Sequence, residues 1–235
     1  MRYEAEVEEL ELPASGKIPA YLQETYWWAY IHPNAVSIFE RQWLVNLILW
    51  GNFNRLRDAA LTEVLPGGRT LQVACVYGNF TDRLARRLDG AGTLDVVDIL
   101  PIQIANLQRK ISPALPVQAH LRDSTALGFP DASYDQVMLF FLLHEQPAAV
   151  RSETLREAWR VLKPGGRMIV VDYHGPGGWH PLRYLFGPLL GRLEPFALDL
   201  WQHDLREWLP RDVAAAAIRK ETYYGGLYQK LVITR

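Results

Sequence analysis

The sequence has little of three things that direct proteins to special environments: cysteine, an excess of one charge, and long hydrophobic runs. Cys75 is the single cysteine among 235 residues, so an internal disulfide cannot form. The 25 basic and 26 acidic residues leave a net charge of −1, and a global attraction to nucleic acid is therefore not expected. A chain of this length still buries a sizeable core without disulfides or metal clips.

Apolar runs stay well short of the roughly 20 residues that a transmembrane helix needs. Leu47 to Trp50 and Val137 to Leu143 are the best of them, and polar neighbours interrupt both. The first seventeen residues contain five Glu and no apolar segment, unlike a secretory signal or a basic transit peptide. We therefore expect a cytoplasmic protein with a disordered acidic tail over residues 1–18.

Aromatic residues are abundant, with 8 Trp, 11 Tyr and 8 Phe. Many lie between residues 21 and 50, where a helix is predicted from Pro33 to about Trp50 because apolar residues recur there at a spacing of three and four. A second helix is predicted over about 54–64. Residues 19–66 are thus expected to form an N-terminal helical cap.

From residue 67 to residue 235, short β-like runs alternate with helix-like stretches. This pattern predicts an α/β fold with a Rossmann-like, doubly wound, mostly parallel sheet of seven strands, because right-handed crossovers place helices on both faces. A segment over about 175–210 breaks the rhythm and is expected to be a lid insertion. The turn Gly225-Gly226 predicts an antiparallel C-terminal hairpin. The predicted strands span 70–76, 93–97, 117–120, 134–141, 167–173, 218–224 and 227–234, and the predicted helices span 81–88, 101–110 and 150–162.

The turn after the first predicted strand is the expected ligand site, because doubly wound sheets bind ligands beyond the carboxyl ends of their strands. Asp98, at the end of the second strand, can accept both hydroxyls of a ribose. Asp123 and Ser124 follow the third strand, where they would meet an adenine edge. Val76 stands where a pyrophosphate loop needs glycine, so a nucleoside cofactor without a pyrophosphate is favoured over NAD or FAD.

Two further motifs stand in order behind Asp98 and Asp123: Phe129-Pro-Asp-Ala-Ser-Tyr-Asp135 and the turn Leu162-Lys-Pro-Gly-Gly166. With this ordered set, residues 69 to 174 resemble a class I S-adenosylmethionine-dependent methyltransferase core. The resemblance implies S-adenosylmethionine as the cofactor.

Four stretches carry a narrower resemblance: Thr25 to Tyr30, Glu40 to Gly51, Val73 to Gly78 and Tyr223 to Lys230. In them the chain resembles the rhodoquinone-biosynthesis methyltransferase-like proteins. This implies a bacterial enzyme that converts ubiquinone to rhodoquinone, with S-adenosylmethionine as amino donor and a divalent ion such as manganese assisting. A lipid-soluble quinone is then the substrate partner, and peripheral association with the inner face of the cytoplasmic membrane is expected. Two alternatives stay open, a conventional quinone or small-molecule methyltransferase and a catalytically silent cofactor-binding protein.

The first loop departs from the superfamily pattern of an acid followed by Gly-x-Gly-x-Gly, because Gln72, Ala74 and Val76 replace the acid and the first two glycines. A carboxylate beside the cofactor's α-ammonium would stabilise the charged amine. Our hypothesis is that neutral Gln72 leaves more of that amine free to attack a quinone ring.

The expected site residues fall into four groups. Cofactor contacts are expected from Gln72, Ala74, Tyr77, Gly78, Asp98, Ile99, Asp123, Ser124 and Phe140, and from Tyr26 in a lid. Catalytic roles are expected for Tyr77, His144 and Asp172, and quinone contacts for Trp27, Tyr30, His174, Trp179 and Tyr184. Glu145, Asp172 and His174 are the expected metal ligands, because a hard cation accepts both carboxylate oxygen and imidazole nitrogen. The alternative is structural: aromatics packed within their own helices and hydrogen-bonded core histidines.

Overall fold

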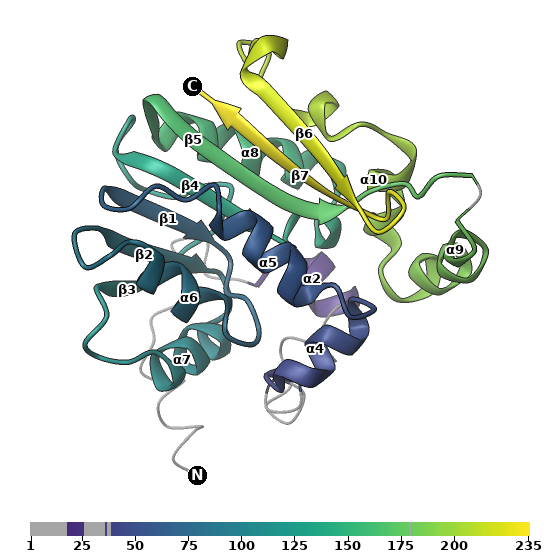
Figure 1. Cartoon of the computed structure of the whole chain (residues 1–235), viewed down its shortest axis with the longest axis horizontal. Helices are drawn as coiled ribbons and strands as arrows, with labels where there is room; N and C mark the ends of the chain where they lie inside the picture. The colour runs from purple at the N-terminus through teal and green to yellow at the C-terminus, as the bar shows by residue number, and fades with distance from the viewer. Residues whose placement is uncertain (1–17, 26–35, 37–38, 179) are drawn as a thin grey trace.

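A computed structural model describes residues 18–25, 36, 39–178 and 180–235, without the side chains of 185, 186, 188, 189 and 193. Its centre is one seven-stranded sheet in the order β3-β2-β1-β4-β5-β7-β6 (Figure 1). The strands are β1 Arg69–Val73, β2 Thr93–Asp98, β3 Val117–Leu121, β4 Tyr134–Phe140, β5 Leu162–Tyr173, β6 Ile218–Tyr223 and β7 Tyr228–Thr234. The predicted fold class is confirmed.

The direction of the strands locates the site. The first five strands pair in parallel, whereas β7 pairs antiparallel with both β5 and β6. The order reverses between β1 and β4, which are adjacent in the sheet but reached by crossovers in opposite directions. The carboxyl ends of β1, β2 and β4 therefore frame the crevice in which such sheets bind ligands.

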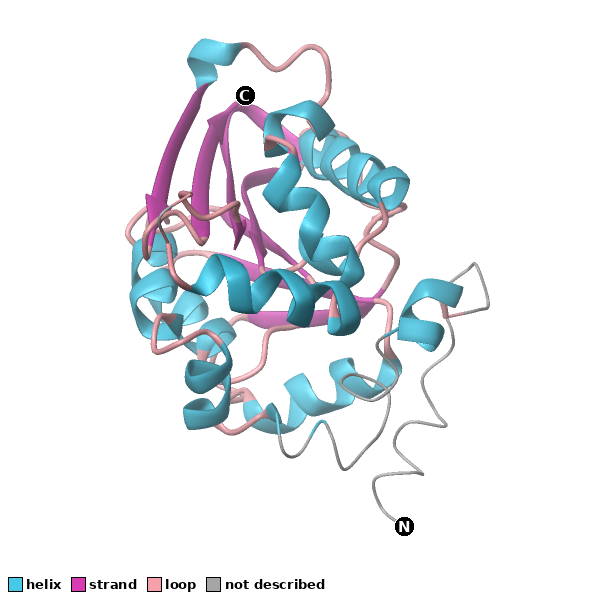
Figure 2. Cartoon of the chain, turned by 90° about the vertical axis from the view of Figure 1, so that its right-hand side faces the viewer, coloured by secondary structure: helices cyan, strands magenta, loops and turns pink. Residues whose placement is uncertain are grey.

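Helices cover both faces of the sheet (Figure 2). Helices α5 Phe53–Leu61, α6 Phe80–Arg87 and α7 Pro101–Lys110 lie on the face turned to the viewer in Figure 1, and α8 Ala148–Val161 lies behind it. The central strands are buried from both sides, so β4 and β5 contain the continuous apolar runs Val137–Phe140 and Met168–Val171. Among the described helices none is both long and apolar enough to cross a bilayer.

The N-terminal region is divided differently from the prediction. Instead of one helix reaching Trp50, the structure has α2 Ala20–Thr25 and a separate α4 Gln42–Ile48. Arg41 has an extended backbone, with φ −69° and ψ 113°, and this interrupts the helix ahead of α4. Residues 33–35, 37 and 38 of the predicted helix lie outside the described residues.

Two strand boundaries also differ. The first strand ends at Val73 and not at 76, because Ala74 adopts a left-handed backbone with φ 72°. β5 begins at Leu162, directly after α8, so the Lys-Pro-Gly-Gly turn expected there belongs to the strand. The pairing of β5 with β4 is irregular between Tyr134 and Gln136, which accommodates the extra residues.

The segment predicted as a lid insertion holds α9 Leu182–Leu193, a short helix η3 Pro195–Leu198, α10 Asp199–Gln202 and η4 Leu205–Trp208. Arg151 of α8 joins it to the core. This fully buried guanidinium donates to the carbonyl oxygens of Leu143, Gln146 and Phe196 at 2.9 to 3.0 Å. It also lies 4.3 Å from the ring centre of Trp208. One side chain thus holds the insertion and the loop after β4 together.

Candidate active site

A cavity of about 740 Å³ lies beyond the carboxyl ends of β1, β2 and β4. Its volume is toward the upper end of the range of about 300 to 1,000 Å³ typical of small-molecule sites. Side chains of α2 and α4 close it from the N-terminal side, and Leu190 and Glu194 close it from the insertion. Most of the wall is apolar and aromatic, and the charged groups gather at its two ends.

Asp98 marks the first end of the cavity. Its two carboxylate oxygens accept hydrogen bonds from the backbone N–H of Cys75 at 2.8 Å and of Leu100 at 2.9 Å. Burial raises the pKa of Asp98 to about 6, although these amides act in the opposite direction. The Cys75 thiol and the Ile99 N–H also act on this carboxylate, and its two oxygens can accept hydroxyl donors that approach from the cavity. The group therefore fits the two hydroxyls of a ribose.

Asp123 and Ser124 line the same end. One oxygen of Asp123 accepts from the backbone and hydroxyl of Thr125, both at 2.8 Å. The Ser124 hydroxyl pairs with the Thr154 hydroxyl at 2.8 Å and accepts from the Gln146 amide at 3.1 Å. Polar groups held in this way can read the edge of a base. Ile99 and Phe140, also expected at the cofactor, lie on the adjoining wall.

Of the four cofactor contacts predicted in and beside the first loop, two line the cavity and two do not. Ala74 and Tyr77 line the cavity, whereas Gln72 and Gly78 do not. Gln72 is fully buried beneath the loop, where its amide donates to the Ala74 carbonyl oxygen at 2.9 Å. Gly78 is covered by the N-terminal region, because its N–H donates to Glu40 and a Cβ would lie 2.7 Å from Gln42 Oε1. The structure therefore keeps the Gln72 amide away from the position expected for a cofactor amine.

We expect Ala74→Gly to stabilise the protein. An alanine at φ 72° carries a strain of about 1 to 2 kcal/mol that glycine avoids, and the greater freedom of glycine in the unfolded chain offsets part of the gain. The net expectation is roughly 1 kcal/mol, measured as a higher midpoint in urea denaturation. Ala85→Gly in the interior of α6 is the control and should lower the midpoint. A lower midpoint for Ala74→Gly would contradict the strain at this position.

Sequence reasoning missed the residue that holds the first loop, Glu40. Its carboxylate accepts from the Gly78 N–H at 3.0 Å, from Asn106 Nδ2 at 2.7 Å and from Lys110 Nζ at 2.8 Å. Lys110 also donates to the carbonyl oxygens of Val76 and Gly78. Glu40 stands in a stretch that carried the family resemblance, but no local pattern could pair it with α7.

Tyr77 lies between the loop and the N-terminal region. Its hydroxyl accepts from Gln103 Nε2 at 2.7 Å, and its ring stacks on Phe39 with ring centres 6.0 Å apart. Burial raises the pKa of Tyr77 above its ordinary value. The phenol is therefore neutral at pH 7 and can bind a ligand through a hydrogen bond, but it does not act as a phenolate base.

His144 and three carboxylates form the second end of the cavity. His144 Nδ1 lies 2.9 Å from the fully buried Asp172, and Nε2 lies 3.7 Å from Glu145 Oε1 and 3.6 Å from Glu194 Oε2. Burial alone would lower the pKa of His144, but Asp172 and then the two glutamates raise it to about 9. His144 is therefore a buried cation at pH 7. Of the four groups, Asp172 alone does not line the cavity.

The predicted metal ligands do not form a metal site. Asp172 accepts from the backbone N–H groups of Leu143 and Tyr173, both at 2.8 Å, as well as from His144. His174 Nδ1 pairs with the Gly226 carbonyl oxygen at 2.7 Å, away from the cavity wall. Within the described part of the chain, no group of three or more His, Cys, Asp or Glu side chains could hold a metal ion. Hydrogen bonds within the protein occupy Asp172 and His174, two of the three predicted ligands.

The two predicted quinone contacts that lie among the described residues, His174 and Tyr184, do not line the cavity. Tyr184 is 76% exposed on α9. Tyr26, Trp27, Tyr30 and Trp179 lie outside the described residues. Among the described residues, the aromatic wall comes from Tyr21, Phe39, Phe53, Phe140, Phe141 and Tyr173, together with Tyr77 and Trp50.

Comparisons with known proteins agree on a methyltransferase. Residues 70–166 match the family model of the methyltransferase domain. The chain is 32% identical over 206 residues to a demethylmenaquinone methyltransferase of Beutenbergia cavernae, covering 81% of each protein. It is 27% identical over 208 residues to the ubiquinone/menaquinone biosynthesis C-methyltransferase UbiE of Ectopseudomonas mendocina, covering 80% of each.

A solved structure supports the fold. The N-methyltransferase NodS of Bradyrhizobium japonicum, in complex with S-adenosyl-L-homocysteine, superposes with a TM-score of 0.54 at 13% identity. The match covers 100% of this chain and 97% of that one. At this identity the likeness concerns the fold and not the substrate.

Proposed function

We propose that this protein transfers a methyl group to a ring carbon of a lipid-soluble quinol. The premise is that the chain belongs to the S-adenosylmethionine-dependent methyltransferase family that includes the demethylmenaquinone methyltransferases. One observation carries the proposal. A single cavity joins the nucleoside-type groups around Asp98 to the charged cluster around His144 through an apolar, aromatic wall. A flat ring with an apolar tail matches such a wall, and a cofactor at Asp98 would face it.

The residues at the Asp98 end fit S-adenosylmethionine. Asp98 would hold the ribose hydroxyls, and Asp123 with Ser124 would meet the adenine. The unusual loop is compatible with this cofactor because no pyrophosphate needs to approach the backbone. When bound, the cofactor supplies an electrophilic methyl group on a sulfonium.

The His144 end supplies what the ring chemistry requires. A quinol attacks through a ring carbon once a hydroxyl oxygen gains negative charge, and a cation placed beforehand in a water-poor site stabilises that charge. His144 is such a cation, held in position by Asp172 at 2.9 Å. The apolar wall keeps water away from the methyl group during the transfer.

A second candidate is the exchange of a ring methoxy group for an amino group, which makes rhodoquinone with S-adenosylmethionine as amino donor. The first loop favours it, because neutral Gln72 and the alanine at Ala74 replace the acid and the glycine of the usual motif. Gln72 lies below the loop, so its effect on a cofactor amine would be indirect. Assistance by manganese would need ligands other than the set Glu145, Asp172 and His174.

One experiment separates the two candidates. The purified protein is incubated in parallel with S-adenosylmethionine labelled on the methyl group or on the amine, and with reduced demethylmenaquinone or ubiquinone. Methyl label in the naphthoquinol supports the proposal, and amine label in ubiquinone supports the second candidate. Label in neither quinone, with the cofactor still bound, would identify a cofactor-binding protein without transferase activity.

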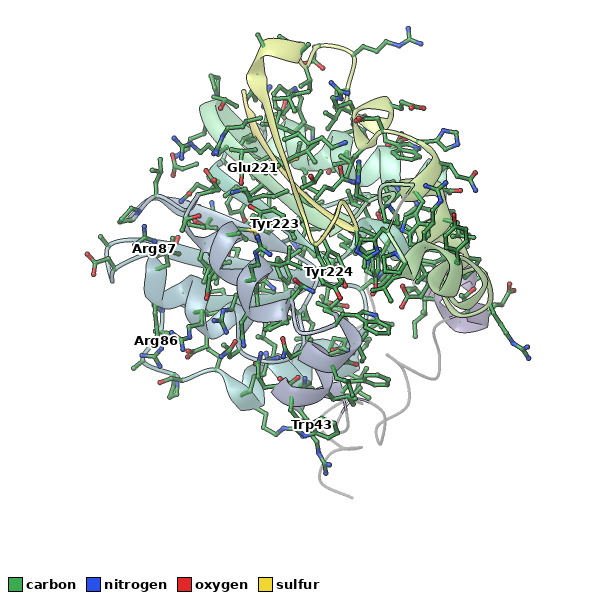
Figure 3. The ribbon with its side chains drawn as sticks, turned by 45° about the vertical axis from the view of Figure 1, so that its right-hand side comes forward. Trp43, Arg86, Arg87, Glu221, Tyr223 and Tyr224 are labelled. Carbon is green, nitrogen blue, oxygen red and sulfur yellow. The ribbon has the colours of Figure 1, made fainter. Side chains whose placement is uncertain are left out.

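We further propose that α4 brings the cavity to the cytoplasmic face of a membrane. Leu47 and Ile48 of α4 and Trp50 just after it line the cavity and are also 40 to 64% exposed, and Trp43 on α4 is 61% exposed. Figure 3 shows Trp43 at the rim of the molecule, pointing away from the sheet. An apolar surface that continues into the cavity would let a polyprenyl tail enter without crossing water.

Trp43→Glu is expected to weaken binding to neutral phospholipid vesicles by roughly tenfold, because a bilayer-facing ring is replaced by a charge. Cosedimentation measures the effect, and binding of the wild type should depend only mildly on salt. Trp43 does not line the cavity, so methyl transfer to a short-chain quinol should be retained. Leu65→Glu, at another exposed apolar position, is the control. A wild-type protein that ignores neutral vesicles at every salt concentration would refute the membrane surface.

A further inference from the structure

Glu194 is an acidic residue of the cavity for which the mechanism above has no role. It follows the last residue of α9, in the insertion between β5 and β6. Its side chain is 23% exposed and lines the cavity, and Oε2 lies 3.6 Å from His144 Nε2. That oxygen has no hydrogen-bond partner among the described residues. A buried carboxylate oxygen without a donor is costly unless a ligand supplies one.

The backbone holds Glu194 in place. Its N–H donates to the Leu190 carbonyl oxygen at 2.7 Å, and its carbonyl oxygen accepts from the Ala197 N–H at 3.0 Å. The next turn is tied to α8, since Phe196 accepts from the buried Arg151 guanidinium at 3.0 Å. The turn that follows Glu194 and the loop that carries His144 are therefore both hydrogen-bonded to Arg151.

The geometry around His144 leaves one free direction. Asp172 takes Nδ1, so Nε2 faces Glu194 Oε2 at 3.6 Å and Glu145 Oε1 at 3.7 Å, and both separations exceed that of a good hydrogen bond. A hydroxyl oxygen placed beside both groups would donate its proton to the carboxylate and accept from Nε2. The cavity wall at this point also carries Phe141 and Tyr173, against which a flat ring can pack.

We propose that Glu194 is the base that removes the proton from the ring hydroxyl of the quinol, with His144 stabilising the oxygen that remains. This inference rests on the proposed function and assigns its proton-transfer step. The insertion then contributes a reacting group and does not only cover the cavity.

The step balances without an added oxidant or reductant. The quinol O–H bond breaks, its proton goes to Glu194 and its electron pair moves into the ring. The ring carbon forms a bond to the methyl group while the sulfonium–methyl bond breaks and leaves its pair on sulfur. The ring carbon then releases its own hydrogen as a proton, which restores the aromatic ring with an anionic oxygen. Glu194 returns its proton to that oxygen, which gives the methylated quinol and regenerates the base. The overall result is one methylated quinol, one thioether and one proton.

The other polar groups at this end are less suited to act as the base. His144 is already protonated at pH 7, and Asp172 is occupied by hydrogen bonds within the protein. Glu145 also faces Nε2, but it already has another interaction within the protein. Burial raises the pKa of Glu194, although His144 opposes this, and a carboxylate with a raised pKa is the stronger base.

The titratable groups around Glu194 come from three elements. They are His144 on the loop after β4, with Glu145 facing the same imidazole, Asp172 and Tyr173 on β5, and Tyr228 on β7. Both tyrosines have raised pKa values because they are buried, so both stay neutral over the acid range. With S-adenosylmethionine saturating, the acid limb of the pH profile should therefore follow Glu194.

The test compares Glu194→Gln with the wild type and with Glu153→Gln, an exposed glutamate of α8. Methyl transfer to a soluble short-chain quinol should fall about a hundredfold or more in kcat for Glu194→Gln, in line with the loss of a general base. The KM for quinol and the Kd for S-adenosylmethionine should change less than threefold. The acid limb of kcat/KM should disappear, and Glu194→Asp should regain part of the activity.

A measurement without cofactor or substrate tests the geometry on its own. Nuclear magnetic resonance titration of the His144 ring should give a lower pKa in Glu194→Gln than in the wild type, because a neighbouring negative charge has been removed. Glu153→Gln should leave that pKa unchanged.

The outcomes are distinguishable. If the wild type moves no methyl group to any quinol, the proposed function fails and this assignment fails with it, whatever the His144 titration shows. If the wild type is active and Glu194→Gln stays within threefold in kcat, or keeps its acid limb, the assignment alone is overturned. A fall in kcat with an equal loss of cofactor binding or thermal stability overturns it as well, because a structural role then explains the effect.

Discussion

Asp98→Ala is expected to weaken S-adenosylmethionine binding by about a hundredfold or more. A carboxylate that accepts two hydroxyl donors contributes on the order of 1.5 to 3 kcal/mol per hydrogen bond, and each 1.4 kcal/mol is a factor of ten in Kd. The fold should survive, because the substitution also removes a buried charge. Isothermal titration calorimetry gives the Kd, and thermal denaturation shows whether the variant is folded.

The same carboxylate predicts how binding depends on pH. Burial raises the pKa of Asp98 from 3.8 to about 6. The free energy of unfolding of the cofactor-free protein therefore decreases as the pH rises from about 4 through 6, because the ionised carboxylate is less favourable in the folded state. The ionised form is the one that accepts both hydroxyls, and the affinity for cofactor should therefore increase between pH 5 and 7. Asp82→Ala on α6 is the control and should leave Kd and its pH profile unchanged. Unaltered affinity in Asp98→Ala would remove the ribose assignment.

Asp172→Asn is expected to reduce kcat by about a hundredfold to a thousandfold and to lower the melting temperature by roughly 10 °C. The neutral amide no longer stabilises the His144 cation, so the positive charge offered to the ring oxygen is lost. Breaking a buried charge pair costs about 3 to 5 kcal/mol, and 1 kcal/mol corresponds to about 2 to 4 °C for a chain of this size. Initial rates and calorimetry measure the two effects.

The stability of the wild type should depend on the charge of His144. Its folded pKa of about 9 lies above the ordinary 6.5, so its contribution is fully present below pH 6.5 and is lost as the pH rises through 9. The shift corresponds to about 3 kcal/mol. Melting temperatures from pH 6 to 10 should fall in the wild type and in the exposed control Asp131→Asn, but much less in Asp172→Asn. Equal slopes in all three proteins would contradict the buried cation.

The sequence pattern predicts the residues at the Asp98 end of the cavity. Asp98 is the last residue of β2, and Asp123 and Ser124 follow shortly after β3. The carboxyl ends of parallel strands converge wherever the rest of the chain lies. The alternation of strands and helices predicted the sheet for the same reason, since hydrophobic periodicity is a property of neighbouring residues. His144 and Glu145 follow β4 and were reached by the same rule.

Side chains whose role depends on the turn of the backbone were harder to place. Gln72 and Gly78 belong to the expected loop, but the left-handed residue Ala74 redirects the chain, and Glu40 from the N-terminal region takes the Gly78 amide. Residue type alone predicts Tyr184 and His174 as quinone contacts. The orientation of Tyr184 depends on how the insertion packs, and that of His174 depends on the C-terminal hairpin, where it pairs with the Gly226 carbonyl oxygen. A spacing rule describes neither.

The sequence by itself determined the α/β class, the order of the elements, the hairpin at the carboxyl end and the groups at the strand ends, because each follows from local periodicity or from the geometry of parallel strands. Only the tertiary structure decided which distant charges meet. Lys110 meets Glu40 at 2.8 Å, and Glu194 lies 3.6 Å from His144. These pairs join separate elements whose relative placement results from burying the whole core. The sequence around each residue therefore does not predict its partner.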